Sequence, residues 1–195
     1  MKLRQIADIN AGYPFRGKIP VVPGSGVVAV QMKDITTQKE ILWENCTHTE
    51  LTAKREPYYL QPGDILVAAR GNHYYAVIIR DEILQAGFQT VAAPHFFMIR
   101  VRSNNIIPEY LAWFLNQRAC QGYLEQNAEG TLTKSIRRSV LEDVTVVMPD
   151  LAKQRSIINL ANILGQEKKI VEGMLRNSER LMNIIANDLL STLKQ

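Results

Sequence analysis

The stretch Pro149-Asp150-Leu151-Ala152-Lys153-Gln154 opens the last part of the chain, and about forty residues follow it without a proline. Apolar residues recur there at helical spacing, so the sequence predicts one helix of roughly 60 Å at about 1.5 Å per residue. Helices of globular domains average about 11 residues. We therefore expect a long C-terminal α-helix, residues 151–195, whose apolar face is covered by something outside its own domain.

The apolar stripe of this segment alternates steps of four and three residues, which is typical of a coiled-coil seam. Polar Lys168 and Ser178 interrupt it where the repeat favours apolar side chains. We expect a coiled coil with a second chain or repeat; packing back on its own domain, through a hinge at Gly165 or Gly173, is the alternative. The residues expected at the seam are Ile157, Ala161, Leu164, Val171, Leu175, Met182, Ile185 and Leu189.

Composition limits the class of protein. The chain has 195 residues, of which 46% are hydrophobic, enough for one packed domain and an extension. No apolar run resembles a signal peptide or is long enough to cross a bilayer. Cys46 and Cys120 form no Cys-x-x-Cys motif, which indicates reduced thiols rather than a zinc site or a disulfide. We expect a soluble, cytoplasmic protein with no membrane partner.

The first 150 residues predict a mixed α/β (α+β) domain. A short amphipathic turn is expected near Leu3, Ile6 and Ile9, and Pro108 precedes a helix expected over 109–125. A shorter helical turn is expected over 136–141. The β-branched and apolar runs predict strands over 27–31, 65–69, 75–80, 87–91, 96–101 and 144–148.

The net charge of +4 is small, but basic residues cluster in two places. One cluster follows an expected strand, where a loop could enter the major groove of DNA. Its candidates for base contacts are Arg70, Asn72, His73 and Tyr74. The second cluster suits phosphate contacts. Its candidates are Lys134, Arg137 and Arg138, with Lys33 and Arg16 as weaker ones. Solvated surface charge is the alternative for both clusters, and a strand residue facing the core is the alternative for Tyr74.

Signals of catalysis are missing from the sequence. Motifs for dinucleotide binding, a phosphate-binding loop, a nucleophilic serine and amino-group methylation are absent, and the three histidines lack metal-ligand spacing. Asp150 and Glu167-Lys168-Lys169 formally fit a nuclease pattern. However, Asp150 is expected to cap the long helix, and Glu167 would lie about 25 Å further along it. We expect no catalytic residues and no metal site.

Four segments, in this order, resemble the specificity (S) subunit of type I restriction-modification systems. They are Leu3-x-x-Ile6-Ala7-Asp8-Ile9 with Gly12-Tyr13-Pro14-Phe15-Arg16, Leu60-x-Pro62-Gly63-Asp64-Ile65-Leu66-Val67 with Arg70-Gly71, Pro108-x-Tyr110-Leu111, and Val146-Val147-Met148-Pro149-Asp150-Leu151-Ala152-Lys153-Gln154. In the last segment the family more often has Pro-Pro and Glu-Gln, where this chain has Pro-Asp and Lys-Gln.

The resemblance implies a target-recognition domain, residues 1–150, that reads one half of a split site in double-stranded DNA. It implies that residues 151–195 are a conserved helix that acts as a spacer and binds methyltransferase (M) subunits. No catalysis and no cofactor are expected on this chain, because S-adenosylmethionine and adenine methylation belong to the methyltransferase. A restriction (R) subunit could join the complex. The resemblance does not transfer the base-reading positions.

The family's subunit usually has two such domains and two helices in tandem, whereas this chain has one of each. A truncated form is one explanation. The other is a homodimer, in which an antiparallel helix pair restores both halves and sets the gap of an interrupted palindrome. A rod of roughly 60 Å corresponds to between one and two turns of duplex at about 34 Å per turn. The alternative function is an interaction protein, a mobile-element half subunit that redirects or competes for a host methyltransferase; a stand-alone nuclease is the weakest alternative.

Overall fold

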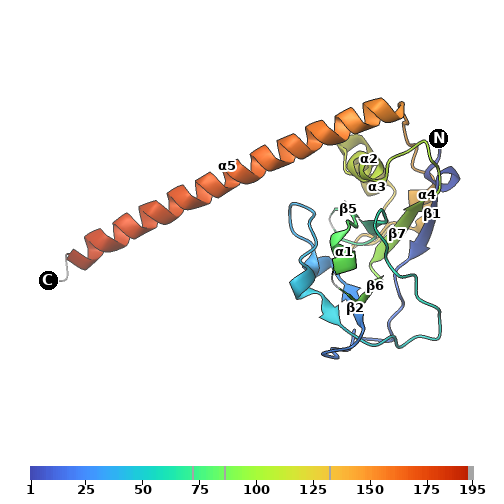
Figure 1. The fold of residues 1–195 in the computed structure, drawn as a ribbon, viewed down its shortest axis with the longest axis horizontal. Coiled ribbons are helices and arrows are strands. Elements are labelled where there is room, and N and C mark those ends of the chain that lie inside the picture. The colour runs from blue at the N-terminus through green and yellow to red at the C-terminus, as the bar shows by residue number, and fades with distance from the viewer. Residues whose placement is uncertain (72, 86, 132, 193–195) are drawn as a thin grey trace. The chain divides into compact units, whose positions relative to one another are not determined.

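The computed structural model describes residues 1–71, 73–85, 87–131 and 133–192, without the side chains of residues 85, 189, 191 and 192. The chain divides into two compact units, Met1–Arg155 and a second that begins at Ser156. The first unit is a mixed α/β domain, and the second consists of the rest of the long C-terminal helix (Figure 1). Within the described residues, no helix combines the length and apolar character that crossing a membrane requires.

The larger sheet of the domain has four antiparallel strands. In spatial order they are β1 (Ala7–Ala11), β7 (Phe96–Val101), β4 (Ile65–Ala68) and β5 (Ala76–Ile78). Ile99 of β7 lies opposite Ile9 of β1 on one side and Ile65 of β4 on the other. Side chains directly opposite one another share a face of the sheet, and all three isoleucines are buried on that face.

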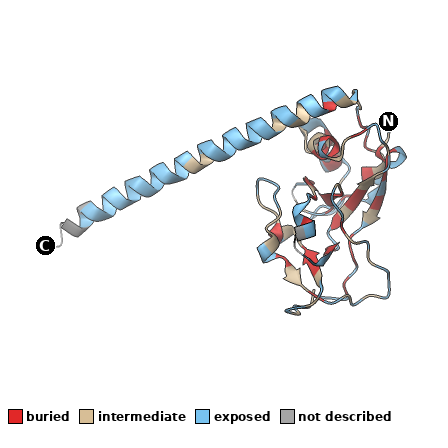
Figure 2. Ribbon diagram, in the orientation of Figure 1, coloured by how far each residue is buried: buried red, intermediate tan, exposed pale blue. Residues whose placement is uncertain are grey.

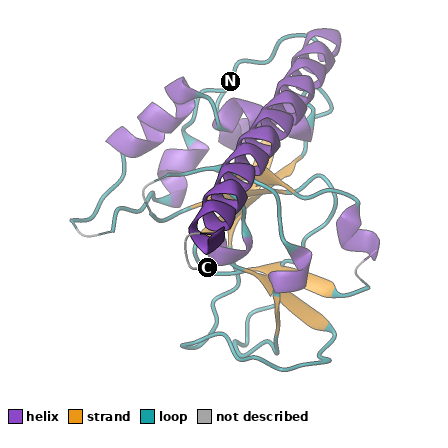
Figure 3. Ribbon diagram, turned by 90° about the vertical axis from the view of Figure 1, so that its left-hand side faces the viewer, coloured by secondary structure: helices purple, strands orange, loops and turns teal. Residues whose placement is uncertain are grey.

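A smaller sheet lies beside the first, and Figure 3 shows the strands in these two groups. Its spatial order is β3 (Thr47–His48), β2 (Val27–Val30) and β6 (Gln89–Ala92). Strands β2 and β6 run parallel, which requires the long crossover that contains β4 and β5. One buried cluster includes residues of both sheets: Val28, Val30, Leu66, Ala68, Ala92, Phe96 and Met98.

Eight helical segments complete the described part of the chain. The 3₁₀ turns are η1 (Leu3–Gln5), η2 (Met32–Asp34) and η3 (Trp43–Asn45). The α-helices are α1 (Glu82–Gln85), α2 (Pro108–Leu115), α3 (Arg118–Gln126), α4 (Arg138–Glu142) and α5 (Leu151–Thr192). Helix α5 has 42 residues, which confirms the expected long helix, and its N-cap is the expected Asp150, whose Oδ1 accepts the Lys153 N–H at 2.7 Å.

Three expectations about local structure were wrong. The helix expected over 109–125 is two helices, because the Asn116 side chain turns to β5 and hydrogen-bonds the Ala76 N–H and C=O at 3.1 and 2.8 Å. The strand expected over 144–148 is only an isolated bridge between Thr145 and Lys2. The amphipathic turn near the N-terminus ends at Gln5, and Ile9 lies in β1, which the sequence pattern did not indicate.

The second segment of the family resemblance, residues 60–67, contains a carboxylate that stabilises the fold. Asp64, which is 1% exposed, follows a turn at Gly63 with φ 87° and accepts the Gln61 N–H at 2.8 Å. Arg100 of β7 donates to both Asp64 carboxylate oxygens at 2.7 Å, and this hydrogen bonding raises the pKa of the guanidinium. Because a buried carboxylate needs such partners, Asp64 fixes the turn before β4 to the middle of the sheet.

Candidate nucleic-acid interface

The two basic clusters, far apart in sequence, lie side by side in the structure. Residues 69–71, which follow β4, pair with residues 134–136: the Gly71 N–H donates to the Lys134 C=O at 3.0 Å, and the Ile136 N–H donates to the Ala69 C=O at 2.9 Å. Arg70 and Ser135 form the bridge between them. Arg70 and Lys134 are both exposed. The backbone therefore brings a candidate base-reading loop next to candidate phosphate contacts.

The second cluster begins on a tight loop. Glu129 and Ser135 exchange two backbone hydrogen bonds, at 2.9 and 2.8 Å, which close the loop between them. Gly130 has φ 121°, and a Cβ there would lie 2.6 Å from the Thr133 carbonyl oxygen, so only glycine fits. Arg137, just after the loop, forms an exposed ion pair with Glu129 at 2.5 Å.

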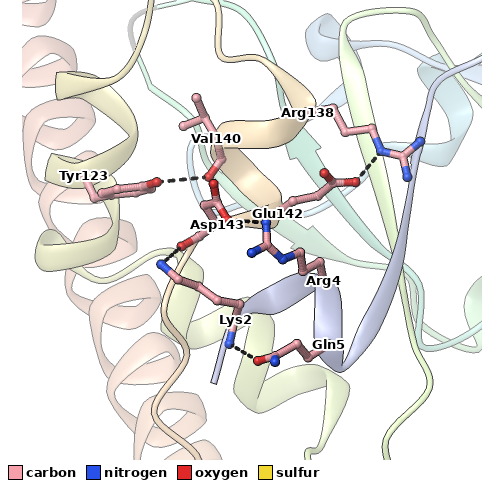
Figure 4. Close-up of polar contacts among 8 residues, drawn as sticks. All are labelled: Lys2, Arg4, Gln5, Tyr123, Arg138, Val140, Glu142 and Asp143. Atoms are coloured by element: carbon pink, nitrogen blue, oxygen red, sulfur yellow. Dashed lines mark hydrogen bonds and ion pairs between the residues drawn. The ribbon is translucent and has the colours of Figure 1, made fainter.

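Arg138 begins α4, which is fixed to the rest of the domain. Figure 4 shows Arg138 paired with Glu142 on the next turn, with Nε 2.7 Å from Oε1. Asp143, which follows α4, receives the Arg4 guanidinium on its carboxylate and the Lys2 Nζ on its carbonyl, both at 2.6 Å. The N-terminal segment therefore holds the helix that presents Arg138.

Tyr74 was wrongly expected to contact bases. Its side chain is 1% exposed and lies in the core, so it cannot reach a base edge. The Gln121 side chain of α3 accepts the Tyr74 N–H at 3.2 Å and donates to its C=O at 2.9 Å, which fixes the end of the loop. His73 is exposed next to it, and Asn72 lies outside the described residues.

The weaker candidates Lys33 and Arg16 are both exposed but lie in different surroundings. Lys33 belongs to η2, where the Met32 methyl group lies 3.6 Å from the position of a Cβ on Gly71. The turn that carries Lys33 therefore neighbours the Arg70 loop. Arg16 follows Phe15, which packs on the smaller sheet, and the Arg16 N–H donates to Thr52 Oγ1 at 3.1 Å.

Arg138 also borders a polar cavity of about 310 Å³ that the sequence did not predict. Asp8 and Asn10 of β1 and Arg100 of β7 line it with Tyr58. These residues meet through strand pairing, with Asp8 directly opposite Arg100. No sequence signal could have found the cavity, because its residues come from four separate segments.

We expect the double substitution Arg137→Ala/Arg138→Ala to weaken DNA binding equally for all sequences. Each phosphate contact contributes about 0.9 to the slope of log affinity against log salt, so the loss of two lowers the slope by about 2 at most. A salt titration of binding measures this. The control is Glu129→Gln/Glu142→Gln, which removes the paired acids and should tighten binding. A changed sequence preference in the arginine variant would contradict the phosphate assignment.

No group of three or more His, Cys, Asp or Glu side chains that could hold a metal ion occurs among the described residues. Burial raises the pKa of Cys46 to about 12 and that of Cys120 to about 11, so both remain neutral thiols at pH 7. Asp150 of the nuclease pattern is engaged as the helix cap.

Helix α5 presents apolar side chains along its length from residue 160 on, and Figure 2 shows this helix as mostly exposed. Of the expected seam, Leu164, Val171, Leu175, Met182 and Ile185 are between 45% and 64% exposed, and Ile157 is half-buried. The Leu189 side chain lies outside the described residues. A coiled-coil partner for this seam stays a prediction.

A family model described as the type I restriction modification DNA specificity domain matches residues 1–174. The fold resembles the S subunit of a type I restriction-modification system from M. genitalium (14% identity, TM-score 0.54, 85% of this chain and 38% of that one). It also resembles the HsdS subunit from Thermoanaerobacter tengcongensis (16%, 0.59, 85% and 36%).

A third similar structure is described as the structural basis underlying complex assembly and conformational transition of the type I R-M system (17% identity, TM-score 0.57, 87% of this chain and 38% of that one). The chain therefore spans between 36% and 38% of the length of these three proteins. No curated protein matches the sequence.

Proposed function

The chain belongs to the family of type I restriction-modification DNA specificity domains, and from this premise we propose that it is a non-catalytic subunit that reads one half of a split DNA site as a homodimer. Residues 1–150 are its target-recognition domain, and residues 151–195 are the spacer helix. The partner methyltransferase holds S-adenosylmethionine and methylates adenine in the site. A restriction subunit can join this complex.

The observation that carries the proposal is the backbone pairing of residues 69–71 with 134–136. This pairing brings the segments that carry Arg70 and Lys134 together, which supports a DNA-binding region that combines a loop for base edges with cations for phosphates. DNA-binding proteins divide their contacts in the same way, since phosphate contacts set the register and base contacts supply specificity.

A homodimer is supported by the exposed apolar seam of α5. Burying one leucine or methionine side chain contributes about 2 kcal/mol, and the seam offers several in each copy. An antiparallel pairing of two such helices buries both seams symmetrically. It also places two target-recognition domains at fixed separation, so the dimer reads an interrupted palindrome.

A second seam supports a methyltransferase partner. Its residues are Ile163, Ile170, Met174 and Leu181, each of which directly precedes a residue of the first seam. Successive residues of an α-helix are about 100° apart, so the two seams face different directions. All four are between 58% and 64% exposed. A helix that is apolar on two faces requires more than one partner.

We expect Leu164→Glu/Met182→Glu to convert the dimer into a monomer. The substitutions place charges in the buried seam of both copies, and the dimer dissociation constant should rise about a hundredfold or more, since 1.4 kcal/mol is tenfold. Sedimentation or light scattering over a concentration series measures this. The control Asn162→Glu/Asn183→Glu adds the same charge at exposed positions outside both seams.

The same variants, together with Ile163→Glu/Leu181→Glu on the second seam, test the complete function in the presence of the methyltransferase. The second-seam variant should remain dimeric but fail to capture the methyltransferase, and sequencing of modified DNA should reveal a split palindrome only with the wild type and control chains. A monomeric wild type, or a contiguous or asymmetric site, would contradict the homodimer. Methyltransferase capture without sequence-specific DNA binding would favour the redirecting half subunit instead.

A further inference from the structure

A short hairpin projects from the domain between η2 and η3, and Figure 1 shows it as the light-blue loop between these two turns. Ile35 and Ile41 form its base as an antiparallel bridge. Above them, the Thr36 N–H donates to the Glu40 C=O and the Lys39 N–H to the Thr36 C=O, both at 2.9 Å. Thr36 Oγ1 also accepts the Glu40 N–H at 3.1 Å. These bonds define one conformation for the 35–41 hairpin.

The base of the 35–41 hairpin is anchored in the domain. Ile35 and Ile41 pack against the buried cluster between the two sheets. Asp34, which is 1% exposed, accepts the Gln31 N–H at 2.8 Å, and its C=O accepts the Leu42 N–H at 2.9 Å. The hairpin is therefore a fixed projection of a rigid scaffold, which is the requirement for a recognition element.

The tip has a different character from the base. Residues 37–40 are all polar and all exposed, so packing in the core does not explain them. Lys39 has φ 63° and is the one non-glycine residue with positive φ in the described part of the chain. This conformation costs roughly 1 kcal/mol for a residue with a Cβ, and glycine would adopt it freely. A lysine there retains a long cationic side chain at the end of the hairpin.

The chemistry and size of the tip fit the major groove of DNA. A glutamine side chain can bond adenine N6 and N7 together, and lysine donates to guanine O6 and N7. A two-stranded ribbon fits a groove about 12 Å wide. The turn before the hairpin lies next to the Arg70 loop, because the Met32 methyl is 3.6 Å from the Cβ position of Gly71. The hairpin therefore stands beside the candidate interface.

We propose that the 35–41 hairpin is a base-reading element, with Gln38 and Lys39 as specificity-determining residues. This inference rests on the proposed function, since it assigns a second reading element to the same DNA-binding surface. The hairpin reads base edges, whereas Lys134, Arg137 and Arg138 set the position of the DNA backbone.

The test uses the full chain and a duplex library with a randomised central segment. The preferred sequence of the wild type is selected first, and Gln38→Ala and Lys39→Gly are then compared with it. Glycine keeps the positive φ of position 39, so the turn remains intact. The matched control is Gln61→Ala, an exposed glutamine outside the hairpin. Circular dichroism verifies that each variant is folded.

The expected result is a change of preference at one or two adjacent base pairs in each half-site. The affinity for the wild-type sequence should fall about ten- to a hundredfold, as for the loss of one good base contact, while the affinity for unrelated duplexes is unchanged. An unchanged preference, or an equal loss on all duplexes, would overturn the assignment of the hairpin. If the wild type itself selects no sequence, the proposed function fails first, and the wild-type arm reveals this separately.

Discussion

Gly12→Ala should destabilise the domain by about 4 kcal/mol or more, a large share of the roughly 5–15 kcal/mol that stabilises a typical domain. A Cβ at this position would lie 2.0 Å from the Ala93 carbonyl oxygen and 2.9 Å from that of Ala92. Both obstacles are backbone atoms, so no side-chain rotation relieves them. Gly12 stands where the chain leaves β1, with its N–H on the Phe96 C=O at 2.9 Å, so the clash would separate the two sheets.

The matched control for this prediction is Gly122→Ala. Gly122 lies inside α3, and a Cβ there would meet no atom within 4 Å. Alanine should stabilise that helix by about 0.5 to 1 kcal/mol, because glycine loses more backbone entropy. Urea unfolding followed by the fluorescence of Trp43 and Trp113 measures both variants, since both tryptophans lie in the first unit. A soluble Gly12→Ala protein within 1 kcal/mol of the wild type would contradict the close approach.

Gln154→Ala should reduce the free energy of unfolding of the same unit by about 3 kcal/mol. The Gln154 side chain is fully buried and makes three hydrogen bonds at the start of α5. Its Oε1 accepts the Ile107 N–H at 2.9 Å, and its Nε2 donates to the carbonyls of Asn105 and Pro149 at 2.9 and 2.8 Å. Alanine leaves these backbone groups without partners, which costs about 1 to 3 kcal/mol for each group that water cannot reach.

The neighbouring Lys153→Ala is the control for Gln154. The Lys153 side chain is exposed, and its backbone N–H, which bonds the Asp150 cap, is unaffected by the substitution. Lys153→Ala should therefore unfold within about 0.5 kcal/mol of the wild type. Gln154→Glu is more informative still, because it keeps the acceptor for Ile107 but turns a carboxylate toward two carbonyls. It should be at least as destabilising as alanine, and a neutral effect would contradict the role of the amide.

The Lys153 side chain is exposed and the Gln154 side chain is buried, which explains why the helix start departs from the family pattern at Lys153 but not at Gln154. The family more often has glutamate where this chain has Lys153, and the exposed side chain tolerates either. Gln154 is the member of the pair that the fold requires, since only its amide serves one donor and two acceptors together. Asp150, which replaces a proline of the family pattern, supplies the helix cap instead.

Local sequence determined the elements whose signals lie within a few residues. Asp150 and the proline-free apolar stripe predicted α5, and the run Phe96–Val101 predicted β7 with the same bounds. The apolar and β-branched runs and the helix signals of residues 1–150 predicted the mixed α/β class, and the turn signal Pro62-Gly63-Asp64 predicted the start of β4. These features are specified by backbone preference and periodicity, which the neighbouring residues already define.

Only the tertiary structure decided how distant segments meet. Arg70 and Lys134 were both candidates in the sequence, but their adjacency depends on backbone pairing across more than sixty residues. The fixed position of the Tyr74 backbone and the break of the helix at Asn116 depend on two side-chain amides, Gln121 of α3 and Asn116 just after α2, which bond the backbone of Tyr74 and Ala76. The sequence did not predict the 35–41 hairpin, because its turn has a lysine at positive φ where glycine would be the usual indication of a turn. Such pairings are selected by the packing of the whole domain at once, so periodicity in one segment cannot specify them.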